Sequence, residues 1–123
     1  MYKILETITQ KLNLGENINS FLYMKTKFSL DQMSLYIYAS YAIKGGYSFK
    51  KALEDRGADF KKEGNKYMGD MIDIALDNLK VFDSIPHALH LAGLINGNTL
   101  NAIESNPGIS EKEMIAIILE KTL

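Results

Sequence analysis

Cysteine and tryptophan are absent from this chain of 123 residues, which also has only two prolines. Without cysteine there can be no disulfide, no thiolate metal ligand and no cysteine nucleophile. The 14 basic and 15 acidic residues give a formal net charge of -1, so neither sign is in excess to attract nucleic acid or anionic lipid. Any electrostatic partner would have to be bound by a local patch.

Long hydrophobic runs are also missing. The longest uninterrupted apolar run, 114–119, is far shorter than the ~20 residues that a membrane-spanning helix needs. The polar residues Glu6, Thr7 and Gln10 interrupt any apolar centre of a signal peptide near the start. We therefore expect that the sequence given does not cross a bilayer and that its beginning stays in the cytosol.

Helical spacing of apolar residues dominates the chain, and no segment alternates apolar and polar residues as a half-buried strand would. Spacing and caps predict helices over 2–12, 30–44, 49–56, 66–80, 85–92 and 98–105 and another beginning at 111. The segment 16–28 is predicted to be an irregular linker, with a short helix within it left open. The start at Leu30 depends on the capping box Ser29–Gln32, and Gly57 is expected to end the helix that begins at Phe49. The alternative is that 58–65 extends this helix up to a break at Gly64.

The predicted fold class is all-α, a compact bundle of six or seven short antiparallel helices. Its length fits one hydrophobic core. Within it we expect an N-terminal helix and linker over 1–28, followed by a helical-bundle domain over 29–123.

The most informative segment, 39–53, predicts two helices joined by a tight turn. Gly45-Gly46 supplies backbone that can adopt positive φ at the end of the first helix, and Ser48 can cap the second. The apolar stripe of the second helix consists of Phe49, Ala52 and Leu53, and the small Ala52 side chain allows the two helices to lie close.

This order of residues resembles a motif of the GspF/PilC family, the inner-membrane platform proteins of bacterial type II secretion and type IV pilus assembly. The family pattern L-A-x-L-L-x-A-G-x-P-L-x-x-A-L opens each cytoplasmic domain. Laid on 39–53 without a gap, it matches at Gly46, Phe49, Ala52 and Leu53, with Ser48 in place of the usual proline. Two further family patterns resemble 82–89 and 114–122 less closely.

The resemblance implies a scaffold domain on the cytoplasmic side of the bacterial inner membrane, cut before the membrane-embedded remainder. Its implied partners are the cytoplasmic assembly ATPase and the inner-membrane pilus or secretion subunits, whose motion it would pass toward pilin or pseudopilin. A type IV pilus system is preferred over type II secretion, and homo-oligomerisation stays open.

Two charged groups are candidate docking surfaces. An acidic stripe recurs at i, i+3 and i+7 on the helix predicted over 66–80, and basic residues gather before it. Most such stripes are simply the solvated face of a helix, and acidic neighbours compensate most of the basic charge. The sharper interpretation of the first group is docking of a basic partner or of a divalent cation, although a straight helix alone cannot supply the six or more oxygen ligands that such a cation needs. For the second group it is docking of an acidic subunit or lipid headgroups. The residues are Asp70, Asp73, Asp77, Lys50, Lys51 and Arg56.

Tyrosine is concentrated around the helix predicted over 30–44, at positions 23, 36, 38, 41 and 47. Because these positions fall on more than one side of the helix, we expect both sides to be covered, either by the core or by another subunit.

Catalysis and cofactor binding are not expected. His87 and His90 are three residues apart on a predicted helix, but two ligands do not make a metal site. Ser84, next to them, is better explained as a helix cap than as a nucleophile. Gly45-Gly46 lacks the lysine and hydroxyl that follow in a phosphate-binding loop.

An alternative function is DNA binding through a helix-turn-helix at 39–56, with 49–56 as the recognition helix. Two observations count against it. The recognition helix would carry Glu54 and Asp55, and the chain has no net positive charge. We therefore expect no nucleic-acid partner.

Overall fold

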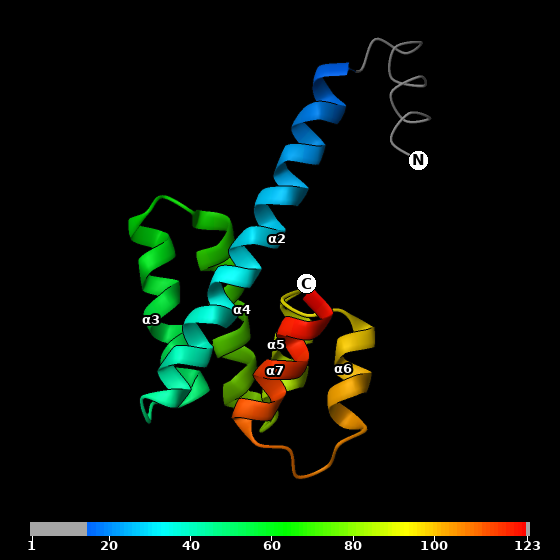
Figure 1. The fold of residues 1–123 in the computed structure, drawn as a ribbon. Helices are drawn as coiled ribbons and strands as arrows, with labels where there is room; N and C mark the ends of the chain where they lie inside the picture. The colour runs from blue at the N-terminus through cyan, green and yellow to red at the C-terminus, as the bar shows by residue number, and fades with distance from the viewer. Residues whose placement is uncertain (1–14, 123) are drawn as a thin grey trace. The chain divides into compact units, whose positions relative to one another are not determined.

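A computed structural model describes residues 15–122, with side chains from residue 27 onward. This range contains helices and no strand, which confirms the all-α prediction (Figure 1). The helix predicted over 2–12 lies outside the described residues. The elements are α2 (Gly15–Lys44), α3 (Phe49–Lys62), α4 (Lys66–Val81), α5 (Ile85–Leu91), α6 (Gly97–Glu104) and α7 (Glu111–Thr122).

The chain divides into two compact units, Met1–Leu30 and Asp31–Leu123. Helix α2 begins in the first unit and ends in the second. The second unit, which we call the helical domain, contains all the hydrogen bonds, ion pairs and core contacts discussed below.

The linker predicted over 16–28 and the helix start predicted at Leu30 are both wrong, because α2 is helical from Gly15 onward. The capping-box residues Ser29 and Gln32 therefore lie inside the helix. Between Glu16 and Phe28 there is no glycine or proline, so no residue forces the backbone out of the helical conformation. A capping box favours a helix start but cannot impose one on a chain that is already helical.

The turn from α2 to α3 is built by local backbone chemistry. The N–H of Gly46 donates to the carbonyl of Ile43 at 3.0 Å, and the N–H of Tyr47 donates to Ala42 at 2.9 Å. This is the Schellman arrangement, and Gly46 accommodates it with a φ of 90°. Ser48 then caps α3, because its hydroxyl accepts a hydrogen bond from the N–H of Lys51 at 3.1 Å.

Gly57 does not end α3, contrary to the first prediction, and the helix continues to Lys62, as the alternative of an extension broken at Gly64 has it. Gly57 is a buried position at which a Cβ atom would lie 2.9 Å from Cγ2 of Ile72. The glycine therefore allows the backbone of α3 to approach α4 closely. The end of α3 is set instead by Gly64, which has a φ of 81°.

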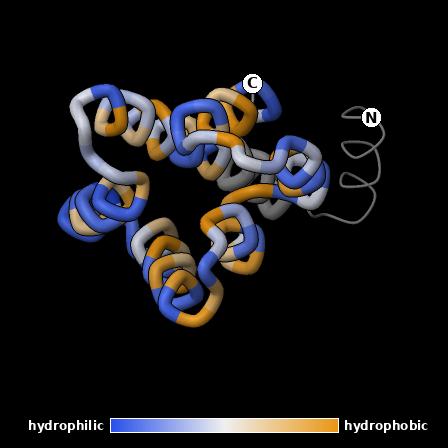
Figure 2. Tube along the Cα trace, turned by 90° about the horizontal axis from the view of Figure 1, so that it is seen from below, coloured by the Kyte–Doolittle hydropathy of each residue, from blue (hydrophilic) through white to orange (hydrophobic). Residues whose placement is uncertain are grey.

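The hydrophobic core draws on every helix of the domain, and α3 and α4 form its most extensive pairing. The helices contain both hydrophobic and hydrophilic residues, as Figure 2 shows. The largest fully buried side chains are Tyr36, Phe49, Phe60, Leu35, Leu53, Met68, Ile72, Leu89, Leu94, Ile115 and Ile118.

Three hydrogen bonds join parts of the domain that are about sixty residues apart. The hydroxyl of Tyr36 donates to the carbonyl of Leu94 at 2.6 Å, and Nε2 of Gln32 donates to the same oxygen at 3.1 Å. Burial raises the pKa of the Tyr36 phenol. The N–H of Phe49 donates to Oε1 of Glu111 at 2.7 Å, so the first turns of α3 and α7 are held together.

Replacing Gly57 by alanine tests the close approach of α3 and α4. Helix propensity alone would make Gly57→Ala stabilising by about 0.5–1 kcal/mol. We expect the opposite, a loss of about 1–3 kcal/mol, because Ile72 is buried and β-branched and cannot move aside. Urea unfolding measures the difference.

The matched background for this test is Ile72→Ala, which removes Cγ2 and leaves a Cβ 3.5 Å from the new methyl group. In that background Gly57→Ala should cost little or nothing. An equal cost in both backgrounds would show that Ile72 is not the obstacle.

Candidate interaction surfaces

The acidic stripe predicted on 66–80 lies on α4, and each of its carboxylates has a lysine partner. Asp73 is bound by Nζ of Lys61 from α3 at 2.6 Å. The other two pair within α4, Asp70 with Lys66 at 3.8 Å and Asp77 with Lys80 at 3.5 Å. These pairs are exposed and weak, but they compensate the charge that a basic partner would have to recognise.

Three of the six predicted docking residues meet at one shallow hollow between α3 and α4. The hollow has a volume of about 390 Å³ and mixes both signs of charge. Lys50 therefore faces the acidic stripe instead of forming a separate basic surface. The lining residues are Lys50, Glu54, Asp73, Leu76, Asp77 and Lys80.

Lys51 belongs to the exposed side of α3. Its Nζ lies 3.0 Å from Oδ1 of Asp55 one turn later, and the hydrogen bond and charge of that carboxylate raise the pKa of the lysine. Glu54 is exposed as well, so a recognition helix formed by α3 would carry two carboxylates that DNA phosphates repel. This arrangement counts against the helix-turn-helix alternative.

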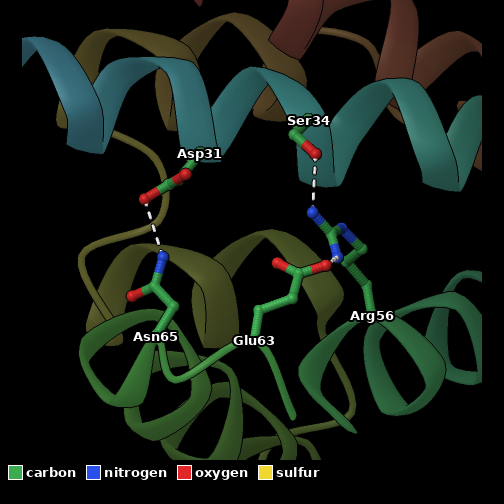
Figure 3. A network of polar contacts seen from close by, with 5 residues as sticks. All are labelled: Asp31, Ser34, Arg56, Glu63 and Asn65. Atoms are coloured by element: carbon green, nitrogen blue, oxygen red, sulfur yellow. Dashed lines mark hydrogen bonds and ion pairs between the residues drawn. The ribbon is translucent and has the colours of Figure 1, made fainter. Parts of the chain in front are cut away.

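The side chain of Arg56, which is mostly buried, connects α3 to α2 (Figure 3). Its Nη2 donates to Oγ of Ser34 on α2 at 2.9 Å, and its Nη1 lies 3.2 Å from Oε1 of Glu63. The guanidinium also stacks 3.8 Å from the centre of the Phe60 ring, and the side chain is only 14% exposed. A second link beside it runs from Nδ2 of Asn65 to Oδ2 of Asp31 at 2.8 Å.

The tyrosines around α2 divide into buried and exposed members. Tyr36 is fully buried, whereas Tyr41 is 69% exposed and Tyr47 59% exposed. Ile37 is also exposed one turn before Tyr41, and Nζ of Lys44 lies 5.6 Å from the centre of the Tyr41 ring. We call Ile37, Tyr41, Lys44 and Tyr47 the tyrosine surface. The clustering of tyrosine in the sequence indicated a surface of this kind. The fold was needed to tell which tyrosines are exposed and which are in the core.

A second exposed apolar surface lies on α4. Tyr67, Ile74 and Val81 are exposed by 61, 47 and 76%, and they follow one another at intervals of seven residues. We call these three residues the α4 stripe. The sequence analysis selected docking residues by charge and did not include these three. An apolar residue of an amphipathic helix is assigned to the core unless the side of the helix that faces the core is known.

His87 links the beginning of α5 to the end of α6. Nδ1 of His87 lies 2.8 Å from Oγ of Ser84, and Nε2 lies 2.7 Å from Oε1 of Glu104. A serine, a histidine and a carboxylate in line are the groups of a hydrolase triad. Here, however, Ser84 is the N-cap of α5, the N–H of His87 is directed at its hydroxyl, and Pro86 has no N–H to offer an oxyanion.

No cluster of three or more histidines, cysteines, aspartates or glutamates suited to a metal ion occurs in residues 15–122. Within the same part of the chain, no helix is both long and apolar enough to span a bilayer. Comparison with family models, with curated proteins and with solved structures gave no match. The likeness to the GspF/PilC family therefore stays a prediction from the motif residues.

The contacts of Arg56 give it a structural role that Lys50 and Lys51 do not share. We expect Arg56→Ala to lower the free energy of unfolding by about 1–2 kcal/mol, through loss of the Phe60 stacking and the Ser34 hydrogen bond. Lys50→Ala and Lys51→Ala should stay within about 0.5 kcal/mol of the wild type. Urea unfolding of the three variants would contradict this account if all three were equally stable.

Proposed function

We propose that the helical domain is a protein-binding scaffold, the first cytoplasmic domain of an inner-membrane platform protein of a type IV pilus or type II secretion system. The observation that carries this proposal is the position of the tyrosine surface. It lies on the end of α2 and on the turn to α3, the same segment whose residues resemble the platform family.

The chemistry of this surface suits protein recognition. Tyrosine is enriched where interfaces gain most of their binding energy, because its ring has large contact area, few rotatable bonds and a polar end. Tyr41 and Tyr47 are exposed, and Lys44 beside Tyr41 adds a cation to the aromatic contact. A partner with apolar side chains and an acidic group would complement this set.

The turn gives the surface a fixed geometry. A Cβ atom on Gly45 would lie 3.7 Å from Cδ2 of Tyr47, so the Tyr47 ring packs beside the glycine. In the two helices that the turn joins, Ala39, Phe49 and Ala52 are fully buried in the core. A displacement of a partner bound to the tyrosine surface would therefore be transmitted to the packed helices α2 and α3. A scaffold that couples the movements of its partners requires such rigid transmission.

The acidic stripe is the weaker of the two docking candidates. Its carboxylates are already paired with Lys61, Lys66 and Lys80. A basic partner would have to replace these ion pairs, so the net binding free energy from its own charges would be small. The tyrosine surface has no comparable internal competitor for its apolar area, and removing that area from water stabilises a complex by about 25 cal/mol for each Å².

Binding to the cytoplasmic assembly ATPase of the same pilus or secretion system tests the proposal. We expect titration calorimetry to detect a complex with the full chain, and Tyr41→Ser combined with Tyr47→Ser to weaken it at least about tenfold. The control is Tyr67→Ser, an equally exposed tyrosine on α4 that should leave the affinity unchanged.

Two results would count against the proposal, and they differ in meaning. If the wild-type chain does not bind the ATPase, the platform role is wrong. If it binds but the double variant binds equally well with unchanged helicity, the role survives and the tyrosine surface is not its docking site.

A further inference from the structure

The connection from α5 to α6 contains Asn96-Gly97, the one place in the sequence where an asparagine is followed by a glycine. Both residues are exposed, and Asn96 is the N-cap of α6. We propose that Asn96 is a site of spontaneous deamidation in the folded domain, where its carboxamide is converted to a carboxylate. This inference does not depend on the proposed function.

The nucleophile of the reaction is the backbone nitrogen of Gly97. Its N–H is the first of α6, so no carbonyl within the helix accepts a hydrogen bond from it. Closing a ring between this nitrogen and Cγ of Asn96 requires rotation about the Cα–C bond of Asn96, whose ψ is 173°. Because residue 97 has no Cβ atom, no side chain of its own opposes that rotation.

The cap hydrogen bond prepares the carboxamide for attack. The N–H of Thr99 donates to Oδ1 of Asn96 at 2.9 Å, and Thr99 is itself buried. When the nitrogen of Gly97 adds to Cγ, negative charge develops on this same oxygen. The N–H of Thr99 therefore serves as an oxyanion-hole donor, and the two reacting groups are held within one turn of the chain.

His90 supplies a base beside the attacking nitrogen. Its Nε2 lies 4.0 Å from the position that a Cβ atom of residue 97 would take. The amide nitrogen of Gly97 is two bonds from that position, so one water molecule can carry its proton to the imidazole. His87 does not have this role, because its ring nitrogens are already bound to Ser84 and Glu104.

The reaction consumes only water and releases only ammonia. The bond between the nitrogen of Gly97 and Cγ of Asn96 forms, and the bond between Cγ and Nδ2 breaks. The proton of Gly97 leaves with Nδ2 as ammonia, and the product is a five-membered cyclic imide. Water then opens the imide at one of its two carbonyl carbons. Opening at Cγ gives aspartate, and opening at the backbone carbonyl gives isoaspartate, in which the chain runs through the side chain.

The two products affect the domain differently, although each changes the formal net charge from -1 to -2. Aspartate keeps an oxygen for the N–H of Thr99 and adds a negative charge at the N-terminus of α6, which the helix dipole favours. Isoaspartate lengthens the backbone by one atom and removes the cap. The change lies two residues after Leu94, whose carbonyl binds Tyr36 and Gln32, so isoaspartate also weakens the contact with α2.

Peptide mapping of the full chain during incubation under native conditions measures the conversion. We expect Asn96 to be converted at least about tenfold faster in the folded chain than in a short peptide covering 92–101, which lacks His90. Asn98 is the internal control, because it is exposed in the same turn but is followed by Thr99, and it should stay unmodified. Conversion that is equal or slower in the folded chain would overturn the proposal.

Two substitutions separate the contributions of the nucleophile and the base. Gly97→Ala fits the structure, because its Cβ atom would meet His90 at an ordinary contact distance, and it should nearly abolish the conversion. His90→Gln should remove most of the rate advantage over the peptide, whereas the matched variant His87→Gln should keep it. Circular dichroism checks that each variant is folded. Conversion of a folded His90→Gln variant at the wild-type rate would overturn the proposed role of His90.

Discussion

The buried carbonyl of Leu94 is the constraint on which the domain depends most. A backbone oxygen inside a core is costly unless it is hydrogen-bonded, and this one receives both Tyr36 and Gln32 from α2. Gly93 turns the backbone so that the carbonyl can be reached, with a φ of 80°. Since α2 is the one helix shared by the two units, this contact also fixes which side of α2 faces the core and which side stays exposed.

Both exposed apolar surfaces follow from that choice of sides. With Leu35, Tyr36 and Ala39 in the core, Ile37 and Tyr41 must lie on the outer side of α2. The close pairing of α3 and α4 at Gly57 does the same for α4, since it directs Ile72 inward and leaves Ile74 outside. The same choice of sides thus leaves apolar area exposed on both α2 and α4.

Local chemistry in the sequence predicted the end of α2, the caps at Ser48 and Ser84 and the existence of five further helices. Each of these depends on residues within one turn. Other outcomes depended on partners more distant in the chain and could not be predicted from spacing: Gly57 needs Ile72, and Arg56 needs Ser34 on α2. The same holds for the candidate site, where α4 was correctly placed but the Lys61 partner of Asp73 comes from another helix.

The most direct test of the central constraint is the pH dependence of stability in the wild type and in Tyr36→Phe. A phenol ionises near pH 10 in an unfolded chain, and burial raises the pKa of Tyr36 above that value. The folded state therefore holds this proton more tightly, and the associated stability, complete below about pH 10, is lost as the pH rises further. We predict that above about pH 10 the free energy of unfolding falls more steeply for the wild type, by up to about 1.4 kcal/mol per pH unit. Parallel curves for the two proteins would contradict the account.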